Sequence, residues 1–241
     1  MDGLLLIHPF PLDARMWSAQ MDRRTVVAPD LPGFGGSPAA DGGVLTMDLG
    51  ARRCLDALDH AGVDRAVVCG LSMGGYVAFE LWRQAPQRIA GLILANTRAG
   101  ADTPEAAEAR RTLAVRLRSE GNVLVESPPP LLSEDPPVGL WDVVKGWIRE
   151  QPAEAIAAAA LGMAERPDST PDLATIDAPT LVITSDGDLL IPADVSAPMA
   201  DQIPGAQLAV LGSAGHLSNL EDPTGFSKLV DAHLERCGIE P

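Results

Sequence analysis

The sequence predicts an α/β protein, in which a mostly parallel sheet is flanked by helices and carries a helical cap insertion. Three observations predict this class. Short apolar runs bounded by turn residues recur along the chain, helical patterns lie between them, and one long central stretch has no strand pattern. Apolar runs of this kind are typical of strands buried on both faces of a parallel sheet. Strands that alternate with helices indicate an α/β fold.

The predicted strands are six short apolar runs. Their side chains do not alternate between apolar and polar, which distinguishes them from strands with one face in water. They occupy residues 4–7, 25–28, 66–69, 89–95, 180–184 and 207–211.

Helix start and stop signals lie between these strands. Thr46 is a good N-cap, and Gly62 can end the helix that follows it. A second helix is predicted to follow Met73 and to stop before Pro86. The last helix is predicted to begin at Asp222-Pro223, a capping residue followed by a favourable first-turn residue.

The central stretch, residues 98–170, shows no convincing strand pattern; it combines helical patterns with Pro-rich loops at residues 128–130 and 136–137. Thr103-Pro104 opens one helical pattern, a second surrounds Trp141, and an Ala-rich third one covers residues 152–164. We therefore predict a core made of residues 1–97 and 171–241, and a helical cap formed by residues 98–170.

Composition excludes several classes of protein. The formal net charge of −15 disfavours nucleic acid as a partner, and no apolar stretch reaches the roughly 18 residues of a membrane span. The spacing of Cys54, Cys69 and Cys237 fits neither a disulfide framework nor a metal site, and no H-x-x-x-H spacing occurs. We expect a cytoplasmic protein with reduced thiols, no cofactor, no metal and a small-molecule substrate; a homodimer stays open.

A G-x-S-x-G pattern occupies Gly70-Leu71-Ser72-Met73-Gly74. It follows the predicted strand 66–69 and precedes a predicted helix, and its glycines allow the close backbone approach that a strained turn needs. The alternative is a Gly-rich turn with a solvated serine. We predict that Ser72 is the nucleophile of a serine hydrolase.

A serine nucleophile needs a base, and the chain has four histidines. His60 and His233 fall within predicted helices, and His8 comes too early for the expected order Ser…Asp…His. His216 follows the last predicted strand, at the edge of the sheet where such sites form. We predict His216 as the base and His8 as a structural residue that braces its loop.

The base needs an orienting carboxylate, and Asp188 and its competitor Asp186 both follow the strand 180–184. We favour Asp188, because it lies further beyond the end of the strand than Asp186 and leaves Gly187 to form a turn. The oxyanion of the intermediate needs two backbone N–H donors. Met73 is predicted to supply one and Phe10 the other, since Pro9 has no N–H.

The substrate pocket is expected to be mainly apolar. Candidate lining residues, besides Phe10 and Met73, are Phe34, Trp141, Val144 and Trp147; packing within the cap is an equal alternative for each tryptophan. The sequence shows no cluster of Arg or Lys that would bind a substrate with two carboxylates, so it favours a small uncharged ester as the substrate. Arg98, near the predicted entrance of the cap, is the one position that could reverse this expectation.

Five motifs follow one another along the chain. They are His8-Pro9-Phe10-Pro11-Leu12-Asp13 with Trp17, Asp30-Leu31-Pro32-Gly33-Phe34-Gly35-Gly36-Ser37, Gly70-Leu71-Ser72-Met73-Gly74-Gly75, the turn at Asp188, and Gly215-His216 with Leu220-Glu221-Pro223 nearby. Together these motifs resemble the α/β-hydrolase superfamily over nearly the full length, and within it the small carboxylesterases and the 3-oxoadipate enol-lactonase-like group. Many relatives have Gly where this chain has Pro9, and relatives that are dehalogenases or epoxide hydrolases carry an Asp in place of Ser72.

The resemblance implies a serine carboxylesterase that works through an acyl-enzyme intermediate, with the triad Ser72, Asp188 and His216. A lactonase is the second reading, followed by C–C hydrolases and perhydrolases. Two other classes stay open: a non-catalytic ligand-binding protein with an intact triad, and an acyltransferase. Slow turnover with retained product would favour the first, and an alcohol or thiol that outcompetes water would favour the second.

Overall fold

The computed structural model describes residues 1–241, and its centre is a sheet with the strand order β2-β1-β3-β4-β5-β6. Every neighbouring pair is parallel. All six predicted strands are confirmed, and the fold class with them. Their bounds are β1 (Asp2–Ile7), β2 (Val26–Val27), β3 (Arg65–Leu71), β4 (Ile89–Ala95), β5 (Thr180–Ser185) and β6 (Gln207–Leu211).

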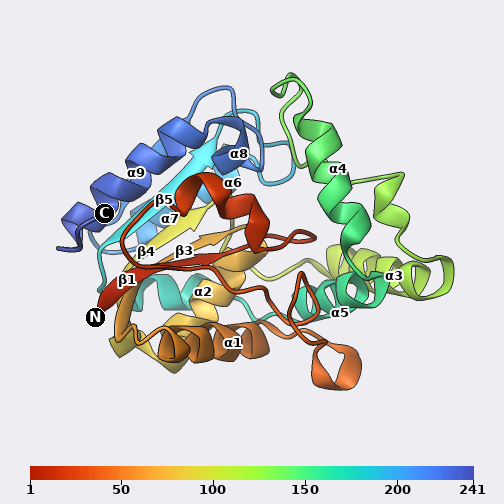
Figure 1. Cartoon of the computed structure of the whole chain (residues 1–241), viewed down its shortest axis with the longest axis horizontal. Helices are drawn as coiled ribbons and strands as arrows, with labels where there is room; N and C mark the ends of the chain where they lie inside the picture. The colour runs from red at the N-terminus through yellow and green to blue at the C-terminus, as the bar shows by residue number, and fades with distance from the viewer.

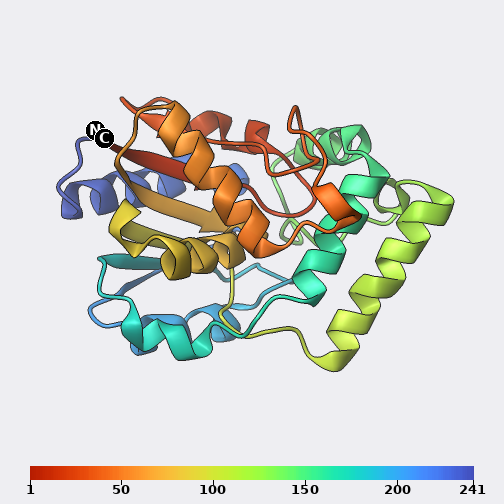
Figure 2. The ribbon, with the colours of Figure 1, turned by 90° about the horizontal axis from the view of Figure 1, so that it is seen from below.

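Helices cover both faces of the sheet. Figures 1 and 2 show α1 and α2 on one face and α9 on the opposite face. The longer helices are α1 (Met47–His60), α2 (Met73–Gln84), α3 (Pro104–Glu120), α4 (Leu140–Glu150), α5 (Ala153–Ala164) and α9 (Pro223–Arg236). The shorter ones are α6 (Ala193–Ser196), α7 (Pro198–Gln202) and α8 (Ser218–Glu221). None of them has the length and apolar character of a membrane-spanning helix.

Three predicted helix starts are confirmed by side chains that accept a backbone N–H of the first turn. Thr46 accepts from Leu49 at the start of α1, Thr103 accepts from Ala106 at the start of α3, and Asp222 accepts from Gly225 at the start of α9. Each bond satisfies one of the N–H groups that a helix leaves free at its N-terminus.

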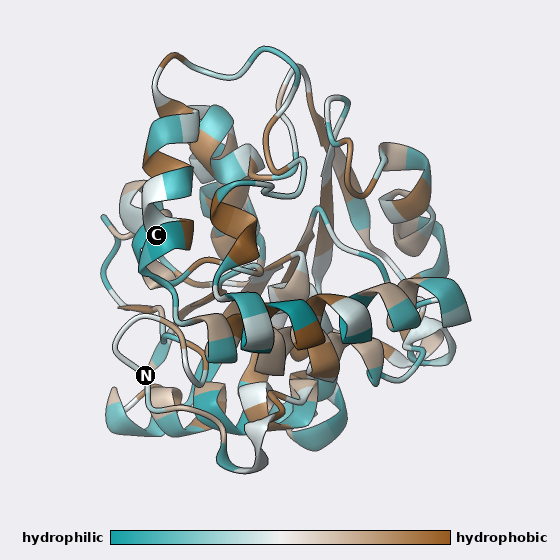
Figure 3. Cartoon of the chain, turned by 90° about the vertical axis from the view of Figure 1, so that its right-hand side faces the viewer, coloured by the Kyte–Doolittle hydropathy of each residue, from teal (hydrophilic) through white to brown (hydrophobic).

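The stretch between β4 and β5 contains helices and no strand, as predicted. In Figures 1 and 2, α3, α4 and α5 lie together at one end of the sheet, and α3 packs against α5. Figure 3 looks onto this end, and its helices alternate between teal and brown along their length, as helices with one apolar side do. The exact division of the chain into core and cap stays a prediction.

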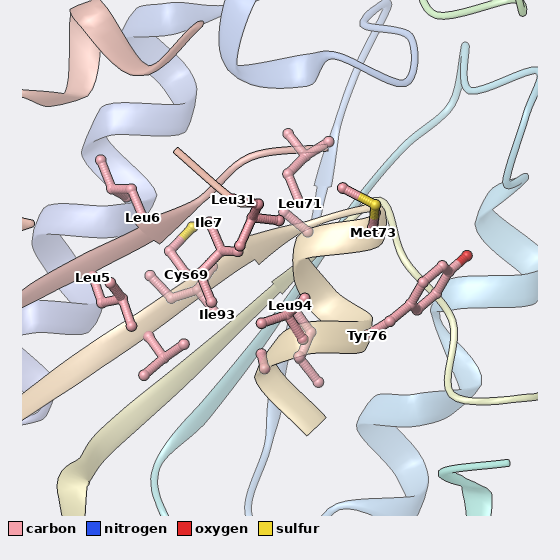
Figure 4. Packing of buried hydrophobic residues seen from close by; sticks show 14 of the residues in the cluster. Leu5, Leu6, Ile7, Leu31, Cys69, Leu71, Met73, Tyr76, Ile93 and Leu94 are labelled. Atoms are coloured by element: carbon pink, nitrogen blue, oxygen red, sulfur yellow. The ribbon is translucent and has the colours of Figure 1, made fainter. Parts of the chain in front are cut away.

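Apolar side chains of the central strands form the core. Figure 4 shows Ile7 of β1, Cys69 of β3 and Leu94 of β4 gathered beside α2, whose first turn carries Met73 and Tyr76. The core thus holds the start of α2 firmly against the end of β3.

All three cysteines are free thiols, and burial raises the pKa of Cys54 to about 12.

Helix α2 approaches β1 so closely at Gly74 that no side chain fits between them. A Cβ atom added to Gly74 would lie 2.1 Å from the carbonyl oxygen of Ile7, well inside van der Waals contact. Gly146 in α4 gives the opposite case, because an added Cβ there meets nothing within 4 Å.

These two helical glycines are predicted to respond in opposite directions to substitution by alanine. Gly74→Ala should lower the free energy of unfolding by about 3 kcal/mol or more, since backbone must move to admit the methyl group. Gly146→Ala should raise it by about 1 kcal/mol through helix propensity alone. Urea unfolding of both variants measures the difference; a harmless Gly74→Ala would contradict the packing described at this turn.

Candidate active site

Ser72 lies at the turn that joins β3 to α2. Its backbone has φ 55° and ψ −113°, a region that residues with a side chain rarely adopt. The turn is held by close packing: a Cβ on Gly70 would lie 2.2 Å from the carbonyl oxygen of Gly74. The hydroxyl of Thr97 donates to the carbonyl oxygen of Ser72 at 2.7 Å. The strained conformation is therefore fixed from both sides, as is common at functional sites.

His216 and Asp188 meet at the ends of neighbouring strands. Nδ1 of His216 lies 2.9 Å from Oδ2 of Asp188, and both side chains are fully buried. Nε2 of His216 is buried as well and has no hydrogen-bond partner. A neutral imidazole that donates from Nδ1 to the carboxylate carries its acceptor lone pair on Nε2. Asp186, the competing residue, is exposed.

Asp188 receives hydrogen bonds on both of its carboxylate oxygens. Oδ1 accepts the N–H groups of Leu190 and Ile191, each at 2.9 Å, and Oδ2 accepts the amide of Asn96 at 2.9 Å. Asn96 in turn accepts from the hydroxyl of Ser218 at 2.7 Å. We did not predict Asn96 or Ser218; Asn96 directly follows β4, so the rule that singled out Asp188 after β5 applied to it as well.

These contacts also determine the protonation of Asp188. Burial raises the pKa of this carboxyl group, but hydrogen bonds and charge from His216, together with the N–H of Ile191 and the amide of Asn96, outweigh burial. The net result is a pKa below the ordinary aspartate value. Asp188 is therefore an anion at neutral pH, held beside the imidazole.

Two backbone N–H groups near Ser72 have no acceptor within the chain. The N–H of Met73 opens α2, where the helix itself offers no carbonyl for it. Neither this group nor the N–H of Phe10 donates to another part of the chain. Each of them is therefore a candidate donor to a bound oxygen atom.

The other three histidines lie in different surroundings. Nε2 of His8 accepts the N–H of Leu31 at 3.0 Å, and Nδ1 lies 3.0 Å from the carbonyl oxygen of Pro9, so His8 links two loops. Burial lowers the pKa of His8, which keeps the ring neutral. His60 is exposed on α1, and His233 is buried in α9, where burial lowers its pKa to about 4.

A pocket of about 360 Å³ opens beside Ser72. Phe10 and Ser72 line it from the core, Leu190 and Ile191 follow Asp188, and the remaining wall comes from α2 and the stretch between β4 and β5. That remaining wall consists of Tyr76, Arg98, Arg110, Leu113, Leu124, Ser127, Pro128, Pro129 and Met163.

Five residues that we expected at this pocket are not among its lining residues. One of them, Met73, is fully buried in the core directly after Ser72. Phe34 is fully buried with its ring edge-on to His8, at 5.4 Å between ring centres. Val144 is also fully buried, because the apolar side of α4 packs inward. Trp141 and Trp147 pack against the core from the same helix and are not among the pocket residues. The spacing of apolar residues identified the apolar side of α4, but it did not show whether that side lines the pocket or packs against the core.

Our expectation that no arginines cluster at the pocket is wrong. Arg98 and Arg110 both line it, and Asp102, whose side chain is 1% exposed, binds these two and Arg166. Burial raises the pKa of Asp102, but the hydrogen bonds and charges of Arg110 and Arg166 lower it by more than burial raises it. The net pKa lies below the ordinary aspartate value, so Asp102 is ionised. The residues are too far apart in sequence to suggest a cluster, although Arg98 and Asp102 have the i, i+4 spacing of an ion pair.

No group of three or more His, Cys, Asp or Glu side chains is arranged to hold a metal ion. The groups near the pocket are instead an imidazole paired with a carboxylate, a serine on a strained turn and two free N–H groups. This set of groups suits acyl transfer, in which a base, a nucleophile and an oxyanion site act together.

Known proteins with the same architecture are numerous. The structure superimposes with a TM-score of 0.92 on a thermophilic esterase from Thermogutta terrifontis, solved with malate bound; sequence identity is 41%, over 98% of this chain and 90% of that one. The chain is 29% identical to 3-oxoadipate enol-lactonase 2 of Acinetobacter baylyi, over 97% of this chain and 89% of that protein.

A longer relative is the dihydrolipoyllysine-residue acetyltransferase component of the acetoin cleaving system of Cupriavidus necator. It is 31% identical over 250 residues, which is 97% of this chain but 63% of that protein. A model of the alpha/beta hydrolase family matches residues 4–229. The resemblance seen in the sequence is thereby confirmed, and the chain belongs to the alpha/beta hydrolase family.

Proposed function

We propose that the protein is a serine hydrolase that cleaves small carboxylic esters through an acyl-enzyme intermediate on Ser72. The observation that carries this proposal is the buried pair of His216 and Asp188, with Nε2 of the imidazole left without a partner. Ser72 lines the adjoining pocket. Esterases among the similar structures support the same chemistry.

In the proposed mechanism, the hydroxyl of Ser72 attacks the ester carbonyl and His216 accepts its proton at Nε2. Asp188 holds the imidazole in the required tautomer and stabilises its charged form. The free N–H groups of Phe10 and Met73 bind the oxyanion. His216 then protonates the leaving alkoxide and afterwards activates a water molecule, which releases the acid.

A lactonase is the second candidate, because the same steps open a cyclic ester and the relatives include an enol-lactonase. The two activities differ only in whether the leaving alcohol stays attached to the acid. A panel of lactones and open-chain esters of similar size, assayed side by side, separates them.

Replacing the nucleophile tests the proposal directly. Ser72→Ala is predicted to lower kcat for a short-chain p-nitrophenyl ester at least about 10³-fold, as loss of a serine nucleophile does. Its stability should change little, because the hydroxyl of Ser72 makes no hydrogen bond in the chain while the backbone contacts at its carbonyl remain. Turnover near the wild-type rate in a purified, folded Ser72→Ala sample would exclude Ser72 as the nucleophile.

Asp188 and Asp186 form a matched pair for testing the orienting carboxylate. Asp188→Asn should lower kcat on the order of 10⁴-fold, since the amide no longer imposes the right tautomer on His216. Asp186→Asn serves as the control, because the side chain is exposed and makes no bond to His216. Equal losses in the two variants, or a larger loss in Asp186→Asn, would contradict the assignment.

The lowered pKa of Asp188 predicts a pH dependence of stability. A carboxyl group with a lower pKa in the folded chain stabilises fully above its unfolded pKa, about 3.9, and loses that contribution as pH falls through the folded value. The difference in unfolding free energy between wild type and Asp188→Asn should therefore be largest near pH 7 and shrink below about pH 4. Urea unfolding across this range checks the sign; a gap that widens in acid would contradict it.

A further inference from the structure

We propose that Arg98 and Arg110 bind a carboxylate of the substrate, so that the preferred substrates are small esters that carry a negative charge. The inference rests on the proposed function, because it concerns the pocket beside Ser72. It replaces the expectation of an uncharged ester, which depended on the absence of an arginine cluster.

The cluster is built around one buried carboxylate. Asp102 binds Arg98 at 3.0 Å through Oδ1, Arg166 at 2.8 Å through the same oxygen, and Arg110 through Oδ2. Three positive charges therefore face one negative charge. No acidic residue lines the pocket, so nothing in its wall neutralises the excess.

The three arginines are not equally engaged. Arg166 is buried; its Nη atoms donate to the carbonyl oxygens of Met163 and Gly100, and its guanidinium stacks 4.1 Å from the ring centre of Tyr76. Together with its bond to Asp102, these contacts make Arg166 a structural member of the cluster.

Arg98 and Arg110 keep free donors. Arg98 makes a single hydrogen bond, from Nη2 to Asp102, and its buried Nε has no partner. Arg110 donates from Nε to Asp102 and from Nη1 to the sulfur of Met163, which is a weak acceptor. A guanidinium group presents several N–H donors in a fork that matches the geometry of a carboxylate. Both residues can therefore donate hydrogen bonds to a further anion.

The cluster lies within reach of the reacting atoms. Thr97 contacts Ser72 through a 2.7 Å hydrogen bond, and Arg98 is the next residue in the chain. The pocket of about 360 Å³ holds Ser72, Arg98 and Arg110 together, and it is at the small end for a ligand site. One small molecule can therefore place its ester at Ser72 and its carboxylate at the arginines.

The overall charge of the protein predicts the opposite preference. With a formal net charge of −15, the molecule as a whole repels anions. A preference for an anionic ester would therefore have to come from the local cluster, which makes it a sharp test of these two residues.

The test uses two pairs of esters that differ in charge but little in shape. Monoethyl succinate, with the carboxylate on the acyl side, is compared with ethyl isocaproate, in which an isopropyl group replaces the carboxylate. Acetoxyacetate, with the carboxylate on the alcohol side, is compared with isobutyl acetate. Each reaction consumes one water, breaks the ester C–O bond and releases an acid and an alcohol, so proton release at constant pH measures all four.

The expected result is a kcat/KM for the charged ester at least about tenfold above that of its neutral match, in one of the two pairs; tenfold corresponds to about 1.4 kcal/mol. Arg98→Gln and Arg110→Gln should each lower this ratio about tenfold or more, and added salt should lower it as well. Arg111→Gln is the matched control, because Arg111 is exposed beside Arg110 on α3 and pairs with Glu108; it should leave the ratio unchanged.

Two outcomes overturn the inference: a wild-type enzyme that does not prefer the charged ester in either pair, or a preference that survives both Arg98→Gln and Arg110→Gln. The wild-type ratios do not depend on whether the variants fold. If the neutral esters are hydrolysed and Ser72→Ala abolishes that activity, the proposed function stands whatever the charge preference. If no ester is hydrolysed through Ser72, the proposed function fails first.

Discussion

The close packing of backbone around Ser72 is the constraint on which the rest of the site depends. Gly74 lies against the carbonyl of Ile7, Gly70 against the carbonyl of Gly74, and neither position has room for a Cβ atom. This packing holds Ser72 at a positive φ, and α2 begins at the next residue. The free N–H of Met73 follows from the same geometry, because it belongs to the first residue of that helix.

The parallel sheet then brings the other groups to the same edge. The residues that follow β4, β5 and β6 supply Asn96, Asp188 and His216, which are joined by hydrogen bonds although they are distant in sequence. Asn96 and two backbone N–H groups fix the carboxylate of Asp188, and this carboxylate binds Nδ1 of His216. Together these bonds restrict the orientation of the imidazole ring. Nε2 is the nitrogen left for chemistry.

The sequence was informative wherever local physics decides the outcome. Apolar runs located every strand, and Thr46, Thr103 and Asp222 marked helix starts, because an apolar run and a capping bond each depend on a few neighbouring residues. The expected burial on both faces does not hold for β6 at the edge of the sheet, where Leu208 and Val210 are exposed. Chain order and strand ends singled out the residues around Ser72 in the same way. The pocket wall was not readable, since it depends on how the helices between β4 and β5 dock: α4 buries Val144 in packing, and α3 delivers Arg110 to Asp102.

The central claim is that Ser72 carries the acyl group during turnover. The most direct measurement is mass spectrometry of the protein quenched during hydrolysis of p-nitrophenyl acetate, followed by peptide mapping of any adduct. We expect one acetyl group per chain, located on Ser72 and absent from Ser72→Ala. Steady turnover with no adduct, or an adduct on another residue that forms and decays at the turnover rate, would contradict it.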